Sequence, residues 1–422
     1  MTSLLDALPE VGDKRLAVRL TPDALRRIRA GHPWVYDQSV DTVNRVGRPG
    51  DLAVVFDKKR DFAGIGLWDP ESPIRLKMLH VGSPVTIDRA WFVDRISAAV
   101  EARSSLWSGR ARARIAYRAV NGENDGLPGL VVDCYTDVAV VKLYSEIWFP
   151  HLRTVVDAVM GATAAEHVVL RLARNLADRE TYGLDDGDVL VGDPPDPVLF
   201  QEGRLTFEAD VRHGQKTGHF LDQRANRLQI GKMTAGRTVL DVFASTGGFS
   251  VHAAAGGASS VHAIDQSAPT IAVAERNMAY NAEIPEVAAC DFTTQCADAF
   301  DALGHLGRSS RRFDIVIIDP PSFAQKAATV GRAKAAYAKL TKLAMGVVEH
   351  GGVLVQASCS SRVTSDDFFD TVTAAAVEHG AKLTEIRRTE HDVDHPVTFP
   401  EGAYLKAGYW RVDIGRRARR SG

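Results

Sequence analysis

RTVLDVFASTGGFSVHAAAGGASSVHAIDQS, residues 237–267, is the stretch that decides the fold. It holds a short β-rich run (238–242), a loop with two adjacent glycines, a run of small residues typical of a helix, and a second strand-like run (260–264) closed by Asp265. Strand, glycine loop and helix alternate in this way from about residue 189 onward. The alternation predicts a doubly wound α/β domain, with a mostly parallel sheet and helices on both of its faces.

The loop favours a particular kind of ligand. Glycine lets a ligand approach the backbone, and an acid that closes the next strand, here Asp265, can accept hydrogen bonds from ribose hydroxyls. The pattern T-G-G-F differs from G-x-G-x-x-G and does not favour a pyrophosphate. Asp241 would repel a phosphate but can bind a cationic, methionine-like group. S-Adenosylmethionine (AdoMet) has such a group and no phosphate, so an AdoMet site is predicted, with a tight turn that binds no ligand as the alternative.

Two later segments supply further acids. Ala288-Ala289-Cys290-Asp291 is interpreted as the end of a third strand, which would bring Asp291 to the adenine amino group. FDIVIIDPPSF (313–323) begins as a buried parallel strand, so Asp319 emerges at the carboxyl end, where ligands bind in such sheets. Pro320-Pro321 removes two backbone donors and stiffens the loop beside that acid. The residues predicted to bind AdoMet are Asp241, Phe243, Thr246, Gly247, Asp265, Asp291 and Asp319.

GVLVQASCSS (352–361) places a cysteine, Cys359, where another buried strand ends. Four cysteines in the chain make neither a disulfide framework nor a zinc pattern, so we expect a reducing compartment and predict no metal site. A thiolate in such a compartment can act as a nucleophile. The commoner fate of a cysteine is to pack as a small hydrophobe, but Ser358, Ser360 and Ser361 make the surroundings polar and favour a catalytic role.

Composition places the chain among ordinary globular proteins. Hydrophobic residues make up 45% and charged residues 25% of the 422 positions, enough for two or three domains. The sequence has no apolar run of about 18 residues and no signal-peptide pattern at its start, so a cytoplasmic protein without a membrane span is expected. Residues 1–120 hold 20 Lys and Arg against 14 Asp and Glu, which suggests that this portion faces a polyanion.

The chain divides into three regions by pattern. Residues 1–84 combine short strands with a helix that Thr21-Pro22 should start, which predicts a small β-rich domain. Residues 85–188 mix a helix with strands and predict a central α+β domain. Residues 189–422 form the α/β domain.

The motifs together resemble one known family. DVFASTGGFS, DPPSFA, SCSS and GQKTGHFLDQR (214–224) resemble the AdoMet-dependent methyltransferases that make 5-methylcytosine in large-subunit (23S) ribosomal RNA. RIRAGHPWVY (27–36) resembles their N-terminal RNA-binding PUA domain. YRAVNGENDGLPGLVVD (117–133) is similar to their central domain, and DHPVTFPEGAYLKAG (394–408) to their C-terminal hairpin.

The resemblance implies a class I, Rossmann-like methyltransferase domain and a covalent reaction. Carbon 5 of cytosine is a weak nucleophile, but addition of the Cys359 thiolate at C6 makes the ring enamine-like, so that C5 can take a methyl group. Asp319 would then act as an acid near N3. The implied substrate is ribosomal RNA, naked or in an assembly intermediate, and a homodimer is left open. Residues assigned to the target base are Phe220, Gln223, Arg224 and Pro320.

Two alternatives remain at this point. Guanine-N7 methyltransferases of ribosomal RNA carry similar motifs, but they attack with a ring nitrogen and their last motif lacks the cysteine. A catalytically inactive RNA-binding protein is the other alternative, and retention of Asp241, Asp265, Asp319 and Cys359 argues against it.

Overall fold

The computed structural model describes residues 4–107, 113–324 and 327–415. The chain forms two compact units. The first unit comprises Met1–Gly203, Glu208–Leu221 and Val393–Gly402, and the second comprises Arg204–Phe207, Asp222–Asp392 and Ala403–Gly422. The predicted boundaries at residues 84 and 188 therefore both fall inside the first unit.

The first unit opens with a six-stranded sheet in the order β2-β6-β5-β4-β1-β3. Its helix α1 (Pro22–Arg29) starts as the sequence predicts, because the Thr21 hydroxyl accepts a hydrogen bond from the Ala24 amide and Pro22 occupies the first turn. Ile28 of this helix is fully buried in the apolar core. The strands are β1 (Leu16–Leu20), β2 (Trp34–Tyr36), β3 (Val40–Val43), β4 (Leu52–Phe56), β5 (Phe62–Trp68) and β6 (Ile74–Val81).

A five-stranded sheet, β11-β10-β9-β8-β7, completes the first unit. Helices α2 (Arg89–Glu101) and α3 (Leu152–Ala162) contribute to the same apolar cluster as its inward-facing side chains. Leu67 and Leu79 of the six-stranded sheet belong to this cluster too, so the two sheets share a core. The strands are β7 (Ala116–Asn121), β8 (Leu130–Tyr135), β9 (Val138–Leu143), β10 (His167–Leu172) and β11 (Val189–Val191).

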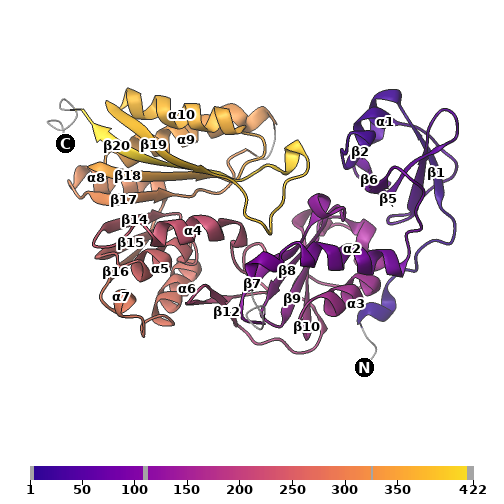
Figure 1. The fold of residues 1–422 in the computed structure, drawn as a ribbon, viewed down its shortest axis with the longest axis horizontal. Helices are drawn as coiled ribbons and strands as arrows, with labels where there is room; N and C mark the ends of the chain where they lie inside the picture. The colour runs from indigo at the N-terminus through magenta and orange to yellow at the C-terminus, as the bar shows by residue number, and fades with distance from the viewer. Residues whose placement is uncertain (1–3, 108–112, 325–326, 416–422) are drawn as a thin grey trace. The chain divides into compact units, whose positions relative to one another are not determined.

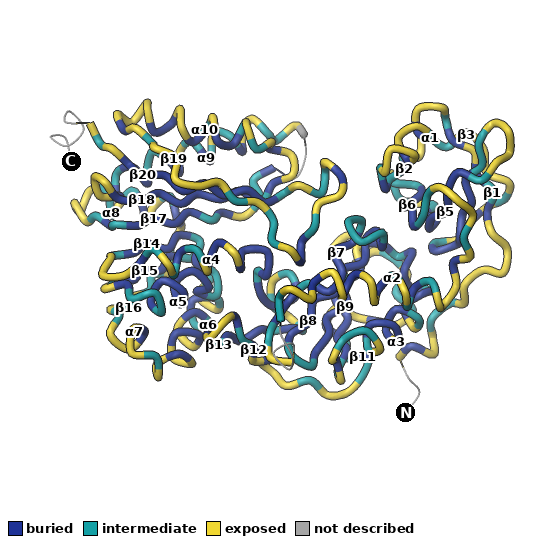
Figure 2. The backbone as a smooth tube through the Cα atoms, viewed as in Figure 1, coloured by how far each residue is buried: buried dark blue, intermediate teal, exposed yellow. Residues whose placement is uncertain are grey.

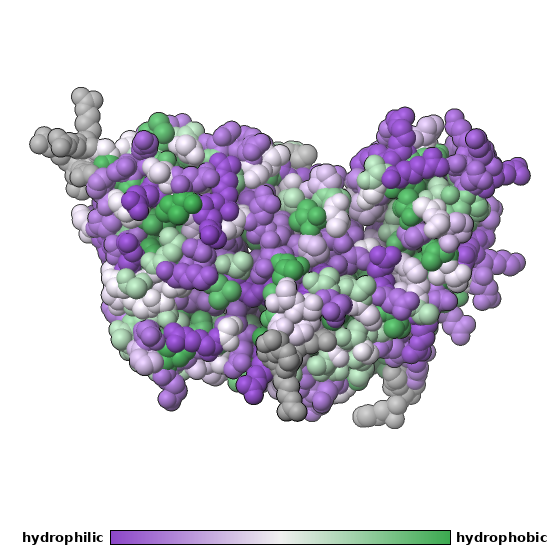
Figure 3. Space-filling model, viewed as in Figure 1, coloured by the Kyte–Doolittle hydropathy of each residue, from purple (hydrophilic) through white to green (hydrophobic). Residues whose placement is uncertain are grey.

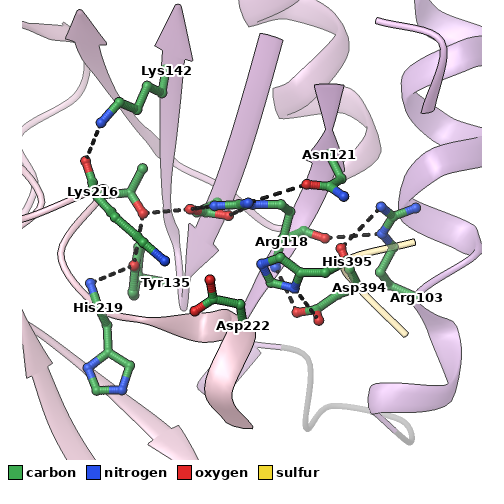
Figure 4. Close-up of polar contacts among 12 residues, drawn as sticks. Arg103, Arg118, Asn121, Tyr135, Lys142, Lys216, His219, Asp222, Asp394 and His395 are labelled. Carbon is green, nitrogen blue, oxygen red and sulfur yellow. Dashed lines mark hydrogen bonds and ion pairs between the residues drawn. The ribbon is translucent and has the colours of Figure 1, made fainter. Parts of the chain in front are cut away.

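Buried polar contacts attach two distant segments to this sheet (Figure 4). Arg118 makes a bidentate pair with the buried Asp133, at 2.8 and 2.9 Å. The Thr217 hydroxyl donates to the same carboxylate at 2.5 Å, and the Arg118 amide donates to Asp394 at 3.0 Å. Because buried charges need partners, these contacts explain why 208–221 and 393–402 belong to the first unit.

The second unit is built on a seven-stranded sheet in the order β16-β15-β14-β17-β18-β20-β19 (Figure 1). The strands from β16 to β18 pair in parallel, whereas β20 runs antiparallel to both β18 and β19. The strands are β14 (Thr238–Val242), β15 (Ser260–Asp265), β16 (Asp291–Cys296), β17 (Phe313–Ile318), β18 (Val348–Ser358), β19 (Ala381–Thr389) and β20 (Lys406–Ile414). A separate pair of short strands is β12 (Val198–Glu202) and β13 (Leu205–Ala209).

Helices cover both faces of this sheet, as the alternating pattern predicts. Leu240 and Val242 pack in a cluster with α8, α9 and α10, whereas Val239 packs in another with α4 and α5. The central strands are accordingly buried along most of their length (Figure 2). The helices are α4 (Arg224–Gly231), α5 (Gly248–Ala255), α6 (Ala268–Ala279), α7 (Pro285–Ala288), α8 (Ala299–Arg308), α9 (Val330–Met345) and α10 (Ser365–Glu378). The predicted doubly wound α/β fold is confirmed.

The strand order reverses at the centre of the sheet. From β14 the chain moves outward to β15 and β16, then returns to place β17 on the other side of β14. A crevice outside the carboxyl ends of the strands at such a switch point is the usual ligand site of open α/β sheets. The topology therefore predicts a ligand site at the loops that follow β14 and β17.

No helix among the described residues is long and apolar enough to cross a membrane. The face of the molecule drawn in Figure 3 is mostly hydrophilic, with apolar side chains scattered among polar ones.

Candidate active site

The loop between β14 and α5 is held in a strained conformation. Phe243 and Ser245 have φ angles of 65° and 49°, in the left-handed region that side chains other than glycine seldom adopt, and Gly247 has φ 76°. A Cβ atom on Gly247 would lie 2.8 Å from the Cβ of Ala274, so α6 packs directly against the loop. The Asn277 side-chain amide donates to the Thr246 carbonyl at 2.9 Å. Strain that surrounding contacts hold in place is typical of a functional site.

Asp241 is a buried acid beneath this loop. Its side chain is fully buried, and one carboxylate oxygen accepts a hydrogen bond from the Ser250 hydroxyl at 2.7 Å. The other oxygen, Oδ1, has no hydrogen-bond partner in the described chain. Burial raises the pKa of Asp241 to about 6, and the negative charge of Asp265 acts in the same direction. A buried, unpaired carboxylate oxygen is suited to a cationic ligand group.

Asp265 closes β15 and contacts the same loop. One carboxylate oxygen accepts from the Ser245 amide at 2.9 Å, and the other accepts from the Ser267 amide at 2.9 Å. The Thr270 hydroxyl donates to the second oxygen at 3.3 Å. An ionised carboxylate offers about four lone-pair sites, so Asp265 can accept ribose hydroxyls as well. The structure brings Asp241, Asp265 and the glycine loop together, as predicted.

The prediction for Asp291 is wrong, because the third strand begins at this residue instead of ending there. Asp291 pairs with Ser260 at the start of β15, and Cys296 pairs with Asp265 at its end. Asp291 is therefore exposed at the amino-terminal edge of the sheet, opposite the loop. Its preceding residues belong to the short helix α7 and the turn after it.

Sequence reasoning missed the acid that follows the carboxyl end of β16. Asp298 comes two residues after the strand, and its carboxylate caps α8 by accepting from the Phe300 amide at 2.9 Å. An aspartate before an amphipathic helix, α8 (Ala299–Arg308), was the available signal, since Asp is a preferred N-cap residue.

Asp319 and Cys359 lie at the ends of neighbouring parallel strands. The Asp319 amide donates to the Val242 carbonyl at 3.3 Å, which fixes the loop after β17 against the end of β14. Cys359 follows β18 directly, and its Sγ donates to the Pro320 carbonyl at 3.8 Å. Burial raises the pKa of Tyr337, and nearby negative charge on Cys359 and Asp319 raises it further, so both groups lie near that hydroxyl.

The turn that carries the thiol is fixed on three sides. The Ser358 and Tyr337 hydroxyls are 2.8 Å apart, and the Ser360 hydroxyl donates to the Ala324 carbonyl at 3.0 Å. Lys406, the first residue of β20, donates to the Ser360 and Val363 carbonyls at 2.5 and 2.6 Å. Sequence reasoning did not single out Lys406, and its place in the hairpin motif was the available signal.

Known proteins match the chain over most of its length. Residues 119–411 match the family described as S-adenosylmethionine-dependent methyltransferase, and residues 18–80 match a PUA-like domain. The ribosomal RNA large subunit methyltransferase of Deinococcus radiodurans is 44% identical over 409 residues, covering 96% of this chain and 99% of the relative. The chain belongs to this family of AdoMet-dependent methyltransferases.

Further relatives agree. Ribosomal RNA large subunit methyltransferase I of Alteromonas mediterranea is 34% identical to this chain over 393 residues, covering 92% of this chain and 97% of the relative. A solved structure from Streptococcus mutans, described as a SAM-dependent methyltransferase, has a TM-score of 0.78 at 20% identity and covers 94% of this chain. This likeness shows the fold alone, and with the family matches it confirms an AdoMet-dependent methyltransferase with a PUA-like domain.

The residues of the methyltransferase fit its cofactor. The unpaired buried oxygen of Asp241 is suited to the cationic methionine part of AdoMet, and the Asp265 carboxylate has acceptor capacity left for ribose hydroxyls. A phosphate group would be repelled by the two carboxylates of Asp241 and Asp265, and AdoMet contains no phosphate.

The predicted substrate residues are divided between the two units. Arg224 is the first residue of α4. Its guanidinium Nη2 and Nε lie 2.9 and 3.0 Å from the Asp392 carboxylate, so the side chain is already part of an ion pair. Gln223 is buried, and its Oε1 accepts a hydrogen bond from the side-chain amide of Asn226 at 2.6 Å. Phe220 belongs to the first unit, where the Lys216 ammonium lies 4.5 Å from the centre of its ring. Base-binding roles for these residues and for Pro320 stay predictions.

One group of residues in the first unit resembles a cation site. Asp137, Glu166 and His167 present carboxylate and imidazole atoms within 4.8 Å of one another. Nδ1 of His167 already accepts a hydrogen bond from the Asp193 amide at 3.0 Å. Because exposed acids often gather without an ion, we assign no metal to this group.

Proposed function

We propose that the methyltransferase forms 5-methylcytosine in the RNA of the large ribosomal subunit, with Cys359 as the nucleophile. The observation that carries the proposal is the contact between the Cys359 sulfur and the Pro320 carbonyl, next to Asp319. It puts a half-buried thiol beside the loop at the topological switch point. The relatives named as ribosomal RNA large subunit methyltransferases support the substrate class.

The chemistry explains why a thiol is needed at that place. The thiolate adds to C6 of cytosine and forms a C–S bond, while the electron pair of the C5–C6 bond shifts through the ring toward N3. Asp319, in its protonated form, donates a proton as charge develops at N3. Bound AdoMet would supply the electrophilic methyl group for C5, with its sulfonium sulfur as the leaving group. A base then removes the C5 proton, the C–S bond breaks to release the thiolate, and the N3 proton returns to Asp319.

The N-terminal sheet supplies a surface for the RNA in this proposal. Arg26 and Arg29 of α1 are exposed and make surface ion pairs with Asp23 and Asp57. Such pairs contribute little to stability and can exchange partners for phosphates. The match to a PUA-like domain over residues 18–80 covers this basic region. We further propose that the protein works in the cytoplasm, where assembling ribosomal subunits offer the substrate.

Nucleoside analysis tests the proposal. Unmodified large-subunit RNA is incubated with the protein and isotopically labelled AdoMet, both as naked RNA and as assembled subunits, and its nucleosides are separated by mass spectrometry. The expected product is labelled 5-methylcytosine in at least one of the two substrates. Label in 7-methylguanine would overturn the cytosine assignment and favour a reaction that needs no nucleophilic cysteine.

A further inference from the structure

We propose that Lys406 is a positioning residue for Cys359, whose ammonium group holds the turn that carries the thiol and stabilises the thiolate by its positive charge. The inference rests on the proposed covalent function, because the thiolate is the form that attacks the cytosine ring. It assigns a role to a buried lysine of β20 that lies outside the loop between β14 and α5.

The first support is the position of Lys406 in the sheet. Lys406 pairs with Ser358 in the antiparallel register of β18 and β20, so its backbone lies next to the residue that precedes Cys359. The side chain is only 3% exposed. Its ammonium donates to the carbonyls of Ser360 and Val363, which both belong to the turn immediately after the thiol. The lysine therefore holds the turn 360–363, which follows Cys359 and helps to orient its sulfur.

The second support is the charge balance around Lys406. Within the described chain its ammonium contacts neutral carbonyls and no carboxylate within ion-pair distance. Burial lowers the pKa of Lys406 to about 8, while negative charge on Cys359 raises it. An electrostatic attraction acts equally on both partners, so the ammonium favours the thiolate as much as the thiolate favours the ammonium.

Two other titratable groups near the thiol, Asp319 and Tyr337, do not supply positive charge. Asp319, at the end of β17, is an anion when ionised and would oppose a thiolate. Tyr337 of α9 is neutral, and its raised pKa, caused first by burial, keeps it so. Its hydroxyl shares a hydrogen bond with Ser358. Lys406 does carry a positive charge, and its contacts with the Ser360 and Val363 carbonyls place that charge at the turn after Cys359.

The pH dependence of Cys359 alkylation tests the inference without RNA. The full-length protein is treated with iodoacetamide at a series of pH values. The rate is followed on the Cys359 peptide by mass spectrometry, because the exposed Cys296 reacts as well. In the parent protein the midpoint should lie below about 8.5, the usual value for a free cysteine. In Lys406→Met the midpoint should rise, and the rate at pH 7 should fall about tenfold for each unit of the rise.

Lys382→Met is the matched control, because Lys382 is an exposed lysine on the neighbouring strand β19. Its alkylation profile should equal that of the parent. An unchanged midpoint in folded Lys406→Met would overturn the inference, and so would a parent midpoint at or above about 8.5, even if the variant does not fold.

The two proposals fail in different ways. If Lys406→Met keeps the parent midpoint while the parent protein makes 5-methylcytosine, the role of Lys406 is wrong and the function stands. If the midpoint of Cys359 alkylation depends on Lys406 but the RNA product is 7-methylguanine, Lys406 does stabilise the Cys359 thiolate and the proposal of covalent cytosine methylation is wrong.

Discussion

At the scale of single residues, the two acids of the candidate cofactor site have opposite surroundings. Asp265 accepts hydrogen bonds from two backbone amides and a hydroxyl, so both of its carboxylate oxygens have partners. Asp241 is buried with one oxygen unpaired, and its pKa is raised to about 6. The first acid is already stabilised without a ligand, whereas the second gains a partner when a cation binds. The two should therefore respond differently to substitution.

AdoMet affinity should fall in acid because of Asp241. Its carboxyl group is ionised above a pH of about 6 and neutral below, so the charge that attracts a cationic ligand is lost as the pH falls through that value. At pH 5 about nine-tenths of the groups are protonated, which predicts affinity about tenfold weaker than at pH 7.5. Calorimetric titration at both pH values measures this ratio. In Asp241→Asn the ratio should shrink toward one, and a ratio that persists there would assign the pH effect to another group.

Asp265→Ala should weaken AdoMet binding about tenfold or more, because the ribose hydroxyls lose a charged acceptor that contributes roughly 1.5–3 kcal/mol. Asp291→Ala is the matched control, since Asp291 lies at the opposite edge of the sheet. Calorimetry should give this control the parent affinity. Equal losses in both variants would contradict the placement of the two acids.

At the scale of elements, the loop between β14 and α5 depends on one glycine. Gly247→Ala should lower the free energy of unfolding by roughly 1–2 kcal/mol from its left-handed φ alone. The contact of the new methyl group with Ala274 adds to that cost. Thermal or denaturant unfolding measures the difference, and AdoMet affinity should fall with it.

Gly331→Ala is the control for that substitution. Gly331 lies in helix α9, and a Cβ atom there meets no other atom within 4 Å. Alanine should stabilise the helix by roughly 0.5–1 kcal/mol, because it loses less conformational entropy than glycine. If Gly247→Ala proved equally stabilising, the packing described for the loop would be incorrect.

The sequence pattern predicted the strands in which a clear β-rich run ends in an acidic residue. Asp265 and Asp319 each follow a clear β-rich run, so their places at the carboxyl edge could be predicted and are confirmed. The run before Asp291 is short, and its small residues suit helix as well as strand, which is why α7 was missed. The contact of Lys406 with the turn after Cys359 depends on the register of β18 with β20, over 40 residues apart in sequence, which local pattern does not encode.

At the scale of the whole molecule, the first unit joins the PUA-like region to the central region. Leu67 and Leu79 share an apolar cluster with Phe92 and Val132, while the other face of the N-terminal sheet packs in a cluster of its own around Ile28. Removal of residues 1–84 would therefore expose part of the core that the remaining residues share with them. The RNA-binding role of the N-terminal sheet is therefore better tested by surface substitutions than by truncation.

Lys58, Lys59 and Arg60 form an exposed basic turn between β4 and β5. If they contact phosphates, replacing all three with serine should weaken RNA binding and lower the slope of log affinity against log salt by about 2 to 3. Filter binding across a salt series measures the slope. AdoMet affinity should be unchanged, and an unaltered salt slope would show that this turn is not an RNA contact.

Covalent trapping tests the central claim, attack by Cys359 on cytosine, most directly. Target RNA containing 5-fluorocytosine is incubated with AdoMet and the protein, and the mixture is denatured and resolved by mass. Fluorine at C5 cannot leave as a proton does, so the parent protein should remain bound to the RNA through the Cys359 sulfur. Cys359→Ala should form no adduct and no methylated product, while its AdoMet affinity stays near the parent value. An alanine variant that still methylates the RNA would contradict the account.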